Sequence, residues 1–424
     1  MNPLTILHLT HQYPPEEMGG VEIHTRDLAR EQAKLGHRVS VIVPSQRAIR
    51  GGLNVTVEAG VRVVRVPIGR RNRARIFAAT WYDPTFLAAF KARLHAVDLV
   101  HMQHLMGIPV EIVALLHQRN IPYVITLHDY WFPCINAQLV TNYDETVCAG
   151  PDAKWHNCGR CFVARAGGGD RPKFAPIIAP LLKNRHKRLK HVFDHAAAVI
   201  SVSHFVKEKY AQLGFAGEHV QVVPTGIEIP EQLKSGKKAR DGQFHVVYVG
   251  SVAPPKGVHV LIEAFNGLPA AAKLTIAGGL EKFPDYVAQL KAAVRHPNVH
   301  LVGRLGRDAV WELLGSAEIS VLPTLWYEAS PLTISEFFAA GLPIIASDIG
   351  AVAERIRHNH DGLLFPPNDA AALHTLLDNL YNDRAQLQHL QQNIPPVTTI
   401  AQYVSQIEAV YRALVEKEGK IISN

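Results

Sequence analysis

Short apolar runs alternate with amphipathic helical patterns through the first half of the chain. Strands are expected near residues 4–10, 38–43, 61–66, 98–101, 123–127, 197–203 and 220–223, and helices near 21–35, 86–94 and 109–119. A repeated strand–helix order is typical of a parallel sheet with helices on its faces. This half therefore predicts one α/β domain.

The alternation starts again at residue 244. Strands are expected near 244–249, 273–277, 299–302, 319–322 and 343–347, helices near 258–265 and 332–340, and the run GLLFPPND closes the pattern. Between the halves, residues 231–242 are polar and turn-rich, which predicts a domain boundary. Helices are expected at about 370–392 and 400–417, separated by Pro395 and Pro396. We expect domains at 1–230 and 243–395 and a final helical segment at 396–424.

Composition fits this division. The chain has 424 residues, of which 47% are hydrophobic and 19% charged, as in a globular protein with two α/β domains of roughly 200 residues each. No run of about 18 apolar residues appears, and the N-terminus lacks a basic region and a small-residue cleavage site. We therefore expect a cytoplasmic protein without a transmembrane helix.

Basic residues form two clusters within a net charge of +7. One contains Arg70, Arg71, Arg73 and Arg75, and the other spans residues 183–191. Such clusters suit an anionic membrane surface, so peripheral contact with the inner face of the membrane is one expectation. The second cluster is equally compatible with the outer face of a helix. No nucleic-acid motif appears, so no nucleic-acid partner is expected.

The stretch WYEASPLTISEFFAAG, residues 326–341, carries two acids eight residues apart. Ser330 is a good N-cap residue and Pro331 suits the first helical position, so a helix is expected to start between the acids. Gly341 is the expected stop. Glu328 would then lie in the loop before the helix, and Glu336 inside it.

This layout favours a particular ligand. The first amides of the helix, near Leu332 and Thr333, would form an anion site suited to phosphate. Glu328 and Glu336 would need neutral partners there, and sugar hydroxyls are suitable donors to carboxylates. A phosphate between two polyols is a nucleotide-sugar. The alternative interpretation is a capped surface helix with two solvated acids.

Three other segments suggest ligand contacts. The loop GSVAPPKG places Lys256 at a helix start, which suits a phosphate, although a solvated lysine is the alternative. Gly19 and Gly20 stand directly before a helix, where a ligand can approach the backbone. His128 follows a strand, and ligands of open parallel sheets bind at the carboxyl ends of strands. His128 is therefore a candidate donor or acid/base.

Residues 130–170 contain every cysteine of the chain: Cys134, Cys148, Cys158 and Cys161. The last two have the C-x2-C spacing, and four cysteines in a chain without an export signal fit a structural zinc site. Free or redox-labile thiols in an insertion are the alternative, because Cys134 and Cys148 do not form a C-x2-C pair.

The motifs PPEEMGG, TLHDYW, VVPTGIE, VYVGSVAPPKG, YEASPLTISE and GLLFPPND, in this order, resemble the retaining glycosyltransferases of glycosyltransferase family 4. The similarity covers nearly the whole chain, and the cysteine-rich insertion looks like that of some bacterial members. The resemblance implies the GT-B fold, with two Rossmann-like doubly wound domains facing a central cleft and a final helix that crosses back to the first domain. It implies no metal or other cofactor for catalysis.

The resemblance also implies roles for individual residues. Lys256 would bind the donor diphosphate, Glu336 the ribose hydroxyls, and Glu328 with the amides of Leu332 and Thr333 the transferred sugar and its phosphate. The remaining expected contacts are Gly20 on the phosphate, His128 beside the sugar, and the backbone of Gly303 and Arg304 on the base.

Three motifs depart from the family pattern. Ser251 replaces the usual arginine of the diphosphate site, Pro331 replaces a glycine and removes one amide donor, and Thr225 with Glu228 changes the PNG-I/V-D motif. The expected reaction is transfer of a sugar from a nucleotide-diphospho-sugar to a saccharide or lipid-linked saccharide acceptor, in bacterial polysaccharide or glycolipid assembly. A nucleotide-sugar epimerase and a non-catalytic nucleotide-sugar-binding subunit remain as alternatives, and Ser251 favours the latter.

Overall fold

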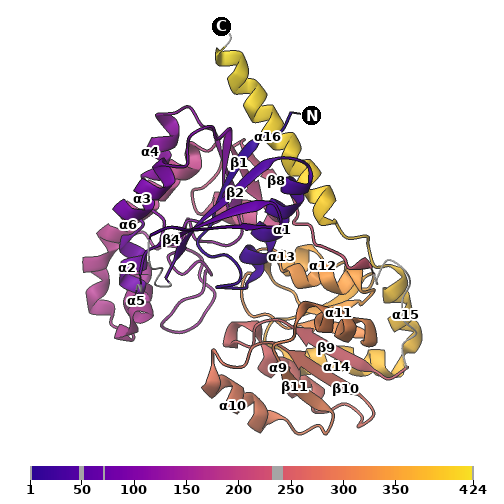
Figure 1. Cartoon of the computed structure of the whole chain (residues 1–424). Coiled ribbons are helices and arrows are strands. Elements are labelled where there is room, and N and C mark those ends of the chain that lie inside the picture. Colours follow the sequence, from indigo (N-terminus) through magenta and orange to yellow (C-terminus); the bar gives the residue numbers. More distant parts are fainter. Residues whose placement is uncertain (1, 47–51, 70–71, 232–241, 423–424) are drawn as a thin grey trace. The chain divides into compact units, whose positions relative to one another are not determined.

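The computed structural model describes residues 2–46, 52–69, 72–231 and 242–422 (Figure 1). The chain divides into two compact units, each described here by itself. Unit 1 contains Met1–Gly226 and Thr399–Asn424, and unit 2 contains Ile227–Thr398. The expected linker at 231–242 lies, except for its two ends, outside the described residues.

Unit 1 is built on a sheet with the strand order β3-β4-β2-β1-β5-β6-β7-β8. Its strands are β1 (Thr5–Leu9), β2 (Arg38–Ser45), β3 (Asn54–Glu58), β4 (Val61–Pro67), β5 (Leu99–Met102), β6 (Tyr123–Leu127), β7 (Ala198–Ser201) and β8 (Val220–Val222). All neighbouring strands pair in parallel except β3 and β4. The sequence pattern missed β3, an edge strand without a fully buried face.

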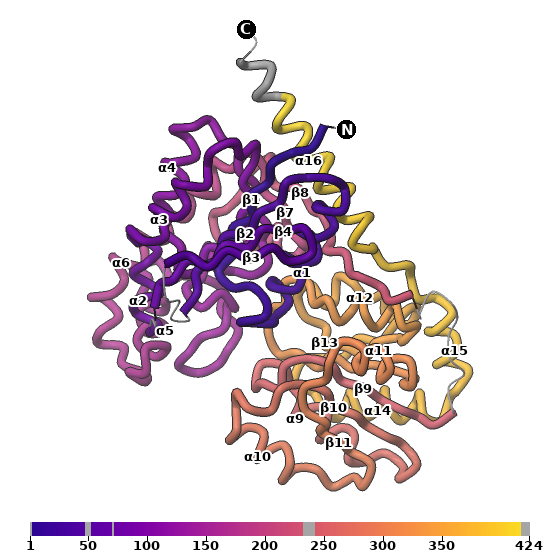
Figure 2. The backbone as a smooth tube through the Cα atoms, viewed as in Figure 1, coloured from indigo at the N-terminus to yellow at the C-terminus, as the bar shows by residue number. Residues whose placement is uncertain are grey.

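The helices of unit 1 are α1 (Gly20–Lys34), α2 (Arg73–Ala78), α3 (Pro84–Lys91), α4 (Ile112–His117), α5 (His156–Val163), α6 (Ala175–Asp194), α7 (His204–Gln212) and α16 (Ile400–Ile422). The last helix runs beside the N-terminal sheet and α1 (Figure 2). It belongs to this unit because its apolar stripe packs against them. Tyr403, Val404, Ile407 and Tyr411 are buried there, spaced as one face of a helix.

Unit 2 contains a fully parallel sheet with the order β11-β10-β9-β12-β13-β14. Its strands are β9 (His245–Val249), β10 (Lys273–Ala277), β11 (Val299–Gly303), β12 (Ile319–Leu322), β13 (Ile344–Ser347) and β14 (Gly362–Phe365). Its helices are α9 (Val258–Phe265), α10 (Pro284–Ala293), α11 (Arg307–Ser316), α12 (Leu332–Ala339), α13 (Gly350–Glu354), α14 (Ala370–Asn382) and α15 (Arg384–Gln392). Two apolar clusters form its core.

Two expectations about helices need correction. The pattern at 370–392 is two helices, because Asp383 ends α14 and its side chain accepts a hydrogen bond from the amide of Gln386 at the start of α15. The other correction concerns the start of α12, which lies in the candidate site. The doubly wound α/β fold that the sequence predicted is confirmed in both units.

The basic clusters lie in unit 1. Residues 183–191 belong to α6, with Lys183, Lys187 and Arg188 exposed and Arg185 buried. Arg73 lies on α2, whereas Arg70 and Arg71 are outside the described residues. Within the described part of the chain, no helix is long and apolar enough to cross a membrane.

Candidate active site

The carboxyl edge of the unit 2 sheet brings Lys256 and Glu328 together. Strands β9 and β12 are parallel neighbours, so the loops that follow them leave the same edge. Lys256 lies in the loop after β9 and Glu328 in the loop after β12. The backbone also joins the loops, since the amide of Leu325 donates to the carbonyl of Pro255 over 2.9 Å.

Gly257 permits this close approach. Its φ of +67° is a left-handed conformation, and a Cβ atom added there would lie 1.8 Å from the carbonyl oxygen of Pro323. A side chain at this position would therefore push the two loops apart. Lys256 is thus placed by the short 3-10 turn Pro254–Lys256 that precedes Gly257.

One oxygen of Glu328 accepts three hydrogen bonds. Oε1 lies 2.5 Å from Nζ of Lys256, 2.7 Å from Nε1 of Trp326 and 3.2 Å from Oγ1 of Thr324. Nζ of Lys256 also lies 5.2 Å from the centre of the Trp326 ring. Oε2 has no hydrogen-bond partner among the described residues, so it can accept a donor from a ligand.

Helix α12 begins one residue later than the sequence predicted. Its N-cap is Pro331, with φ −64° and ψ 118°, and no side chain caps the helix, so the expected N-cap role of Ser330 is wrong. Leu332 and Thr333 are the first helical residues, whose amides lack partners within a helix. Proline offers no side-chain acceptor to them. The two amides are therefore open to a ligand, and the anion site expected at the helix start stays a prediction.

Glu336 has a partner that sequence reasoning missed. The guanidinium of Arg307, at the start of α11, donates to Oε1 of Glu336. Arg307 also lies with its Cζ atom 5.1 Å from the centre of the Trp311 ring. In the structure each acid pairs with a cation of the protein, Glu328 with Lys256 and Glu336 with Arg307. The expected sugar-hydroxyl partners of the two acids stay a prediction.

Ser251, Gly303 and Arg304 lie near the same edge of the unit 2 sheet. The carbonyl of Ser251 accepts a hydrogen bond from the Tyr248 hydroxyl over 2.8 Å. Gly303 ends β11 with φ +75°, and its carbonyl accepts from the amide of Gly278. A Cβ atom on Gly279 would lie 2.9 Å from Nη2 of Arg304, so this side chain packs against the Gly278–Gly279 turn.

In unit 1, helix α1 starts at Gly20 with Gly19 as its N-cap and no capping side chain. A Cβ atom added to Gly20 would meet nothing within 4 Å, whereas one on Gly19 would lie 2.5 Å from Oε2 of Glu22. Gly20 therefore has open space around its backbone, as a ligand-approach position requires.

A chain of hydrogen bonds orients His128, the residue after β6. Its Nε2 lies 2.7 Å from Oε1 of Gln103, whose Nε2 lies 3.3 Å from Nδ1 of His8. Nε2 of His8 in turn lies 2.7 Å from Oε1 of Gln32. With these amide orientations, Nε2 of both histidines carries the proton, and Nδ1 of His128 is left as an acceptor.

Other histidines surround His128, and the buried ones are neutral. Burial lowers the pKa of His8 to about 4 and that of His24 to about 3. Burial, and then the neighbouring imidazoles, lower the pKa of His128 well below its ordinary value. In this environment His128 is a neutral hydrogen-bonding group near pH 7.

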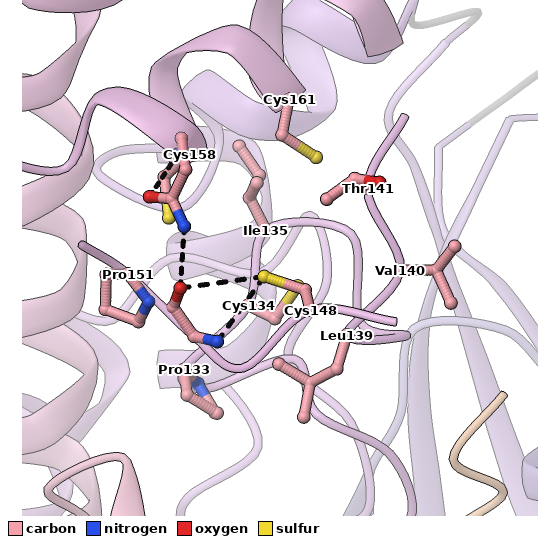
Figure 3. Close-up of a pocket in the computed structure, with 12 residues that line it drawn as sticks. Pro133, Cys134, Ile135, Leu139, Val140, Thr141, Cys148, Pro151, Cys158 and Cys161 are labelled. Atoms are coloured by element: carbon pink, nitrogen blue, oxygen red, sulfur yellow. Dashed lines mark hydrogen bonds between the residues drawn. The ribbon is translucent and has the colours of Figure 1, made fainter. Parts of the chain in front are cut away.

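The four cysteines line one pocket in unit 1 (Figure 3). All four are free thiols. Burial raises the pKa of Cys161 to about 11 and raises the pKa of Cys148 and Cys158 as well. As the side chains are placed, no three metal-ligating groups among the described residues stand close enough together to coordinate an ion.

Two doubly wound α/β units, whose sheets are parallel except for the pairing of β3 with β4, are the architecture of the GT-B glycosyltransferases. A family model described as Glycosyltransferase Family 4 matches residues 18–230, just over half of the chain, and one described as Glycosyl transferases group 1 matches residues 230–395. The chain belongs to glycosyltransferase family 4.

Individual relatives agree with this assignment. The chain is 25% identical to an uncharacterized glycosyltransferase of Methanocaldococcus jannaschii, over 92% of each chain. It is 24% identical to the putative teichuronic acid biosynthesis glycosyltransferase TuaC of Bacillus subtilis, over 87% of each.

Solved structures share the fold. Sucrose-phosphate synthase from Thermosynechococcus elongatus matches with a TM-score of 0.67 and 19% identity, covering 99% of this chain and 98% of that one. Anabaena HepE in complex with UDP and glucose matches with a TM-score of 0.61 and 18% identity, covering 99% of this chain and 100% of that one.

Proposed function

We propose that this glycosyltransferase moves a sugar from a nucleotide-diphospho-sugar to an acceptor hydroxyl with retention of the anomeric configuration. The observation that carries the proposal is the ion pair of Lys256 and Glu328 beside the uncapped start of α12. This arrangement combines a cation, two amide donors and a carboxylate with a free oxygen. A diphosphate with a sugar attached can use all of them.

Donor binding would exchange the partner of Lys256. Its ammonium would turn from Glu328 to the diphosphate, while the amides of Leu332 and Thr333 take a phosphate oxygen. Glu328 would then accept hydrogen bonds from hydroxyls of the transferred sugar. Before the donor binds, the ion pair would neutralise the charge of Glu328, so that an incoming phosphate is not repelled.

The same groups would stabilise the transition state. When the bond between the anomeric carbon and the phosphate oxygen breaks, negative charge grows on the leaving diphosphate beside Lys256 and the helix start. The acceptor oxygen forms its bond on the same face of the sugar, and its proton passes to the departing phosphate oxygen. Because the leaving phosphate oxygen takes the proton, this step needs no protein base. Lys256 and the helix start would neutralise the charge of the leaving diphosphate without a metal ion.

Glu336 and His128 would bind without reacting. Glu336, oriented by Arg307, would accept the ribose hydroxyls. Neutral His128, with Nδ1 free as an acceptor, would take a hydroxyl of the transferred sugar. The backbone near Gly303 and Arg304 would contact the base, and Gly20 would leave room for the phosphate.

The acceptor is proposed to be a saccharide or lipid-linked saccharide in polysaccharide or glycolipid assembly. The relative TuaC, a putative teichuronic acid biosynthesis glycosyltransferase, supports a polysaccharide context. The exposed Lys183, Lys187 and Arg188 on α6 suit contact with an anionic membrane surface. Vesicles with and without anionic lipid test this contact.

The donor is identified first by thermal shift with UDP, GDP and ADP and their sugars. A ligand at 100 times its dissociation constant raises the free energy of unfolding by about 2.7 kcal/mol. The stabilising donor is then incubated with saccharide acceptors, and NMR determines the anomeric configuration of the product. Retention supports the proposal, and an inverted product overturns it.

Glu336→Ala tests the assigned donor site, with the exposed Glu312→Ala as its matched control. We expect the first variant to lose donor-dependent stabilisation and turnover, and the second to keep both. An epimerised donor formed without acceptor, or donor binding without turnover across many acceptors, would contradict the transferase assignment.

A further inference from the structure

The cysteine pocket is separate from the proposed donor chemistry and is formed by three segments. Cys134 follows β6, Cys148 comes after the short antiparallel bridge between Val140 and Val147, and Cys158 and Cys161 lie on α5. Their side chains converge on one pocket (Figure 3). Residues 27 positions apart in the chain are thus brought together by a segment with little regular structure.

Hydrogen-bond donors point at two of the sulfur atoms. The amide of Gly150 lies 3.4 Å from Sγ of Cys148, and Nδ2 of Asn142 lies 3.0 Å from Sγ of Cys161. Gly150 makes its contact with φ +120°, a conformation that side chains rarely adopt. N–H groups directed at sulfur stabilise a thiolate more than a thiol, because the thiolate carries the full charge.

Two guanidinium groups beside the pocket lack an anionic partner. Arg185 is only 2% exposed and donates to the carbonyls of Trp131 and Phe132, just before Cys134. Arg165 is half-buried and donates to Oδ1 of Asn136, just after Cys134. Among the described residues, no carboxylate forms an ion pair with either arginine. A buried cation without a counter-charge is costly, so these arginines imply negative charge nearby.

We propose that Cys134, Cys148, Cys158 and Cys161 bind one zinc ion as a tetrathiolate. Four thiols would release four protons and leave a complex of charge −2, which supplies the anion that Arg165 and Arg185 lack. The four sulfurs would turn into the pocket on binding, since the thiols as placed do not form a coordination group. With four protein ligands, the site has no open position and is structural.

The metal would add to the packing that joins this segment to α5 and α6. Helix α5 is short, and α6 approaches it so closely that a Cβ atom on Gly159 would lie 2.6 Å from the carbonyl oxygen of Ala175. Among the described residues, the apolar cluster beside it has three buried members, Phe77, Ile135 and Leu182, with partly buried hydrophobic side chains packed against them. A zinc ion would join the loop around Cys134 and Cys148 to α5 with four strong bonds.

The test is metal analysis of the full chain purified under reducing conditions, without added metal or chelator. We expect about one zinc per chain and release of that zinc in step with modification of the four thiols by a mercurial reagent. A cobalt-exchanged sample should show sulfur-to-cobalt charge transfer, a readout that does not depend on any variant. Iron in place of zinc, or thiols that react freely without releasing a metal, would overturn the proposal.

Variants test whether the zinc is bound by the four thiols or by a neighbouring histidine. Cys158→Ser and Cys161→Ser should lower the zinc content several-fold, whereas His156→Ala, a potential ligand just before Cys158, should retain it. If the serine variants fail to fold, the cobalt spectrum and the thiol titration of the unaltered chain still decide the matter. Full zinc content in folded serine variants would contradict the assignment.

Discussion

The ammonium nitrogen of Lys256 lies 2.5 Å from Oε1 of Glu328, across the loops that follow β9 and β12. The side chain of Glu328 is 9% exposed and that of Lys256 23%, so this pair is partly shielded from water. The pair keeps the ammonium of Lys256 beside the helix start while the carboxylate of Glu328 neutralises its charge. It also means that removing either residue leaves the other unpaired, which affects how variants must be interpreted.

Lys256→Ala should lower turnover by about 10²- to 10³-fold, as expected for loss of one group that stabilises the leaving charge. The measurement is the initial rate of nucleoside diphosphate release. This variant leaves Glu328 without its cationic partner. The free energy of unfolding is therefore measured for it and for the double variant Lys256→Ala/Glu328→Gln. Lys291→Ala, an exposed lysine on α10, is the control. Turnover of Lys256→Ala within a few-fold of the parent would contradict the role.

Arg307→Met should raise KM for the donor about 10-fold with a smaller effect on kcat, because the arginine orients Glu336 and does not touch the reacting atoms. The expected increase in KM is modest because the Arg307 side chain is 41% exposed, so water weakens its ion pair with Glu336. Arg295→Met, in which an exposed arginine is changed, should leave both constants unchanged. A fall in kcat alone would indicate a different function for Arg307.

Gly20→Ala should separate ligand approach from fold stability. The added Cβ atom meets nothing within 4 Å, so the free energy of unfolding should change by no more than about 0.5 kcal/mol. Donor affinity should nevertheless fall, because the methyl group occupies the space proposed for the phosphate. Gly315→Ala, with equally open surroundings, should change neither quantity. Unchanged donor affinity in Gly20→Ala would remove this residue from the site.

Stability should fall as pH decreases from about 6.5 towards 4. His8 and His24 have folded pKa values of about 4 and 3, below the ordinary value of 6.5. In this window the unfolded chain binds protons that the folded chain does not, which costs about 1.4 kcal/mol per pH unit for each histidine. Chemical denaturation at several pH values measures the slope.

His24→Phe should reduce that slope by about one proton. Both ring nitrogens of His24 are buried without a hydrogen-bond partner, and the ring lies 4.9 Å from that of Tyr403, so phenylalanine loses no polar contact. His300→Phe, at an exposed position, should leave the slope unchanged. An unchanged slope in His24→Phe would show that another group causes the acid sensitivity.

The sequence predicted features that depend on residues close together in the chain. It did not predict contacts that depend on the order of strands in a sheet. From the sequence, Lys256 could be predicted as a phosphate contact and Glu328 as a sugar contact, but their ion pair depends on β9 and β12 being neighbours. Arg307 was missed because nothing near it in the chain points to Glu336, 29 residues away. The start of α12 was misplaced by one residue because serine before proline mimics a capped helix.

The return of α16 to unit 1 affects the order in which the chain acquires structure during synthesis. Ile6, Leu28 and Leu99 pack against Tyr403, Val404 and Ile407, which are made only after the whole of unit 2. Unit 2, a continuous segment, has all its residues before that point. The unit that is encoded first therefore completes its core last, and a chain stopped at residue 398 would leave this apolar surface uncovered.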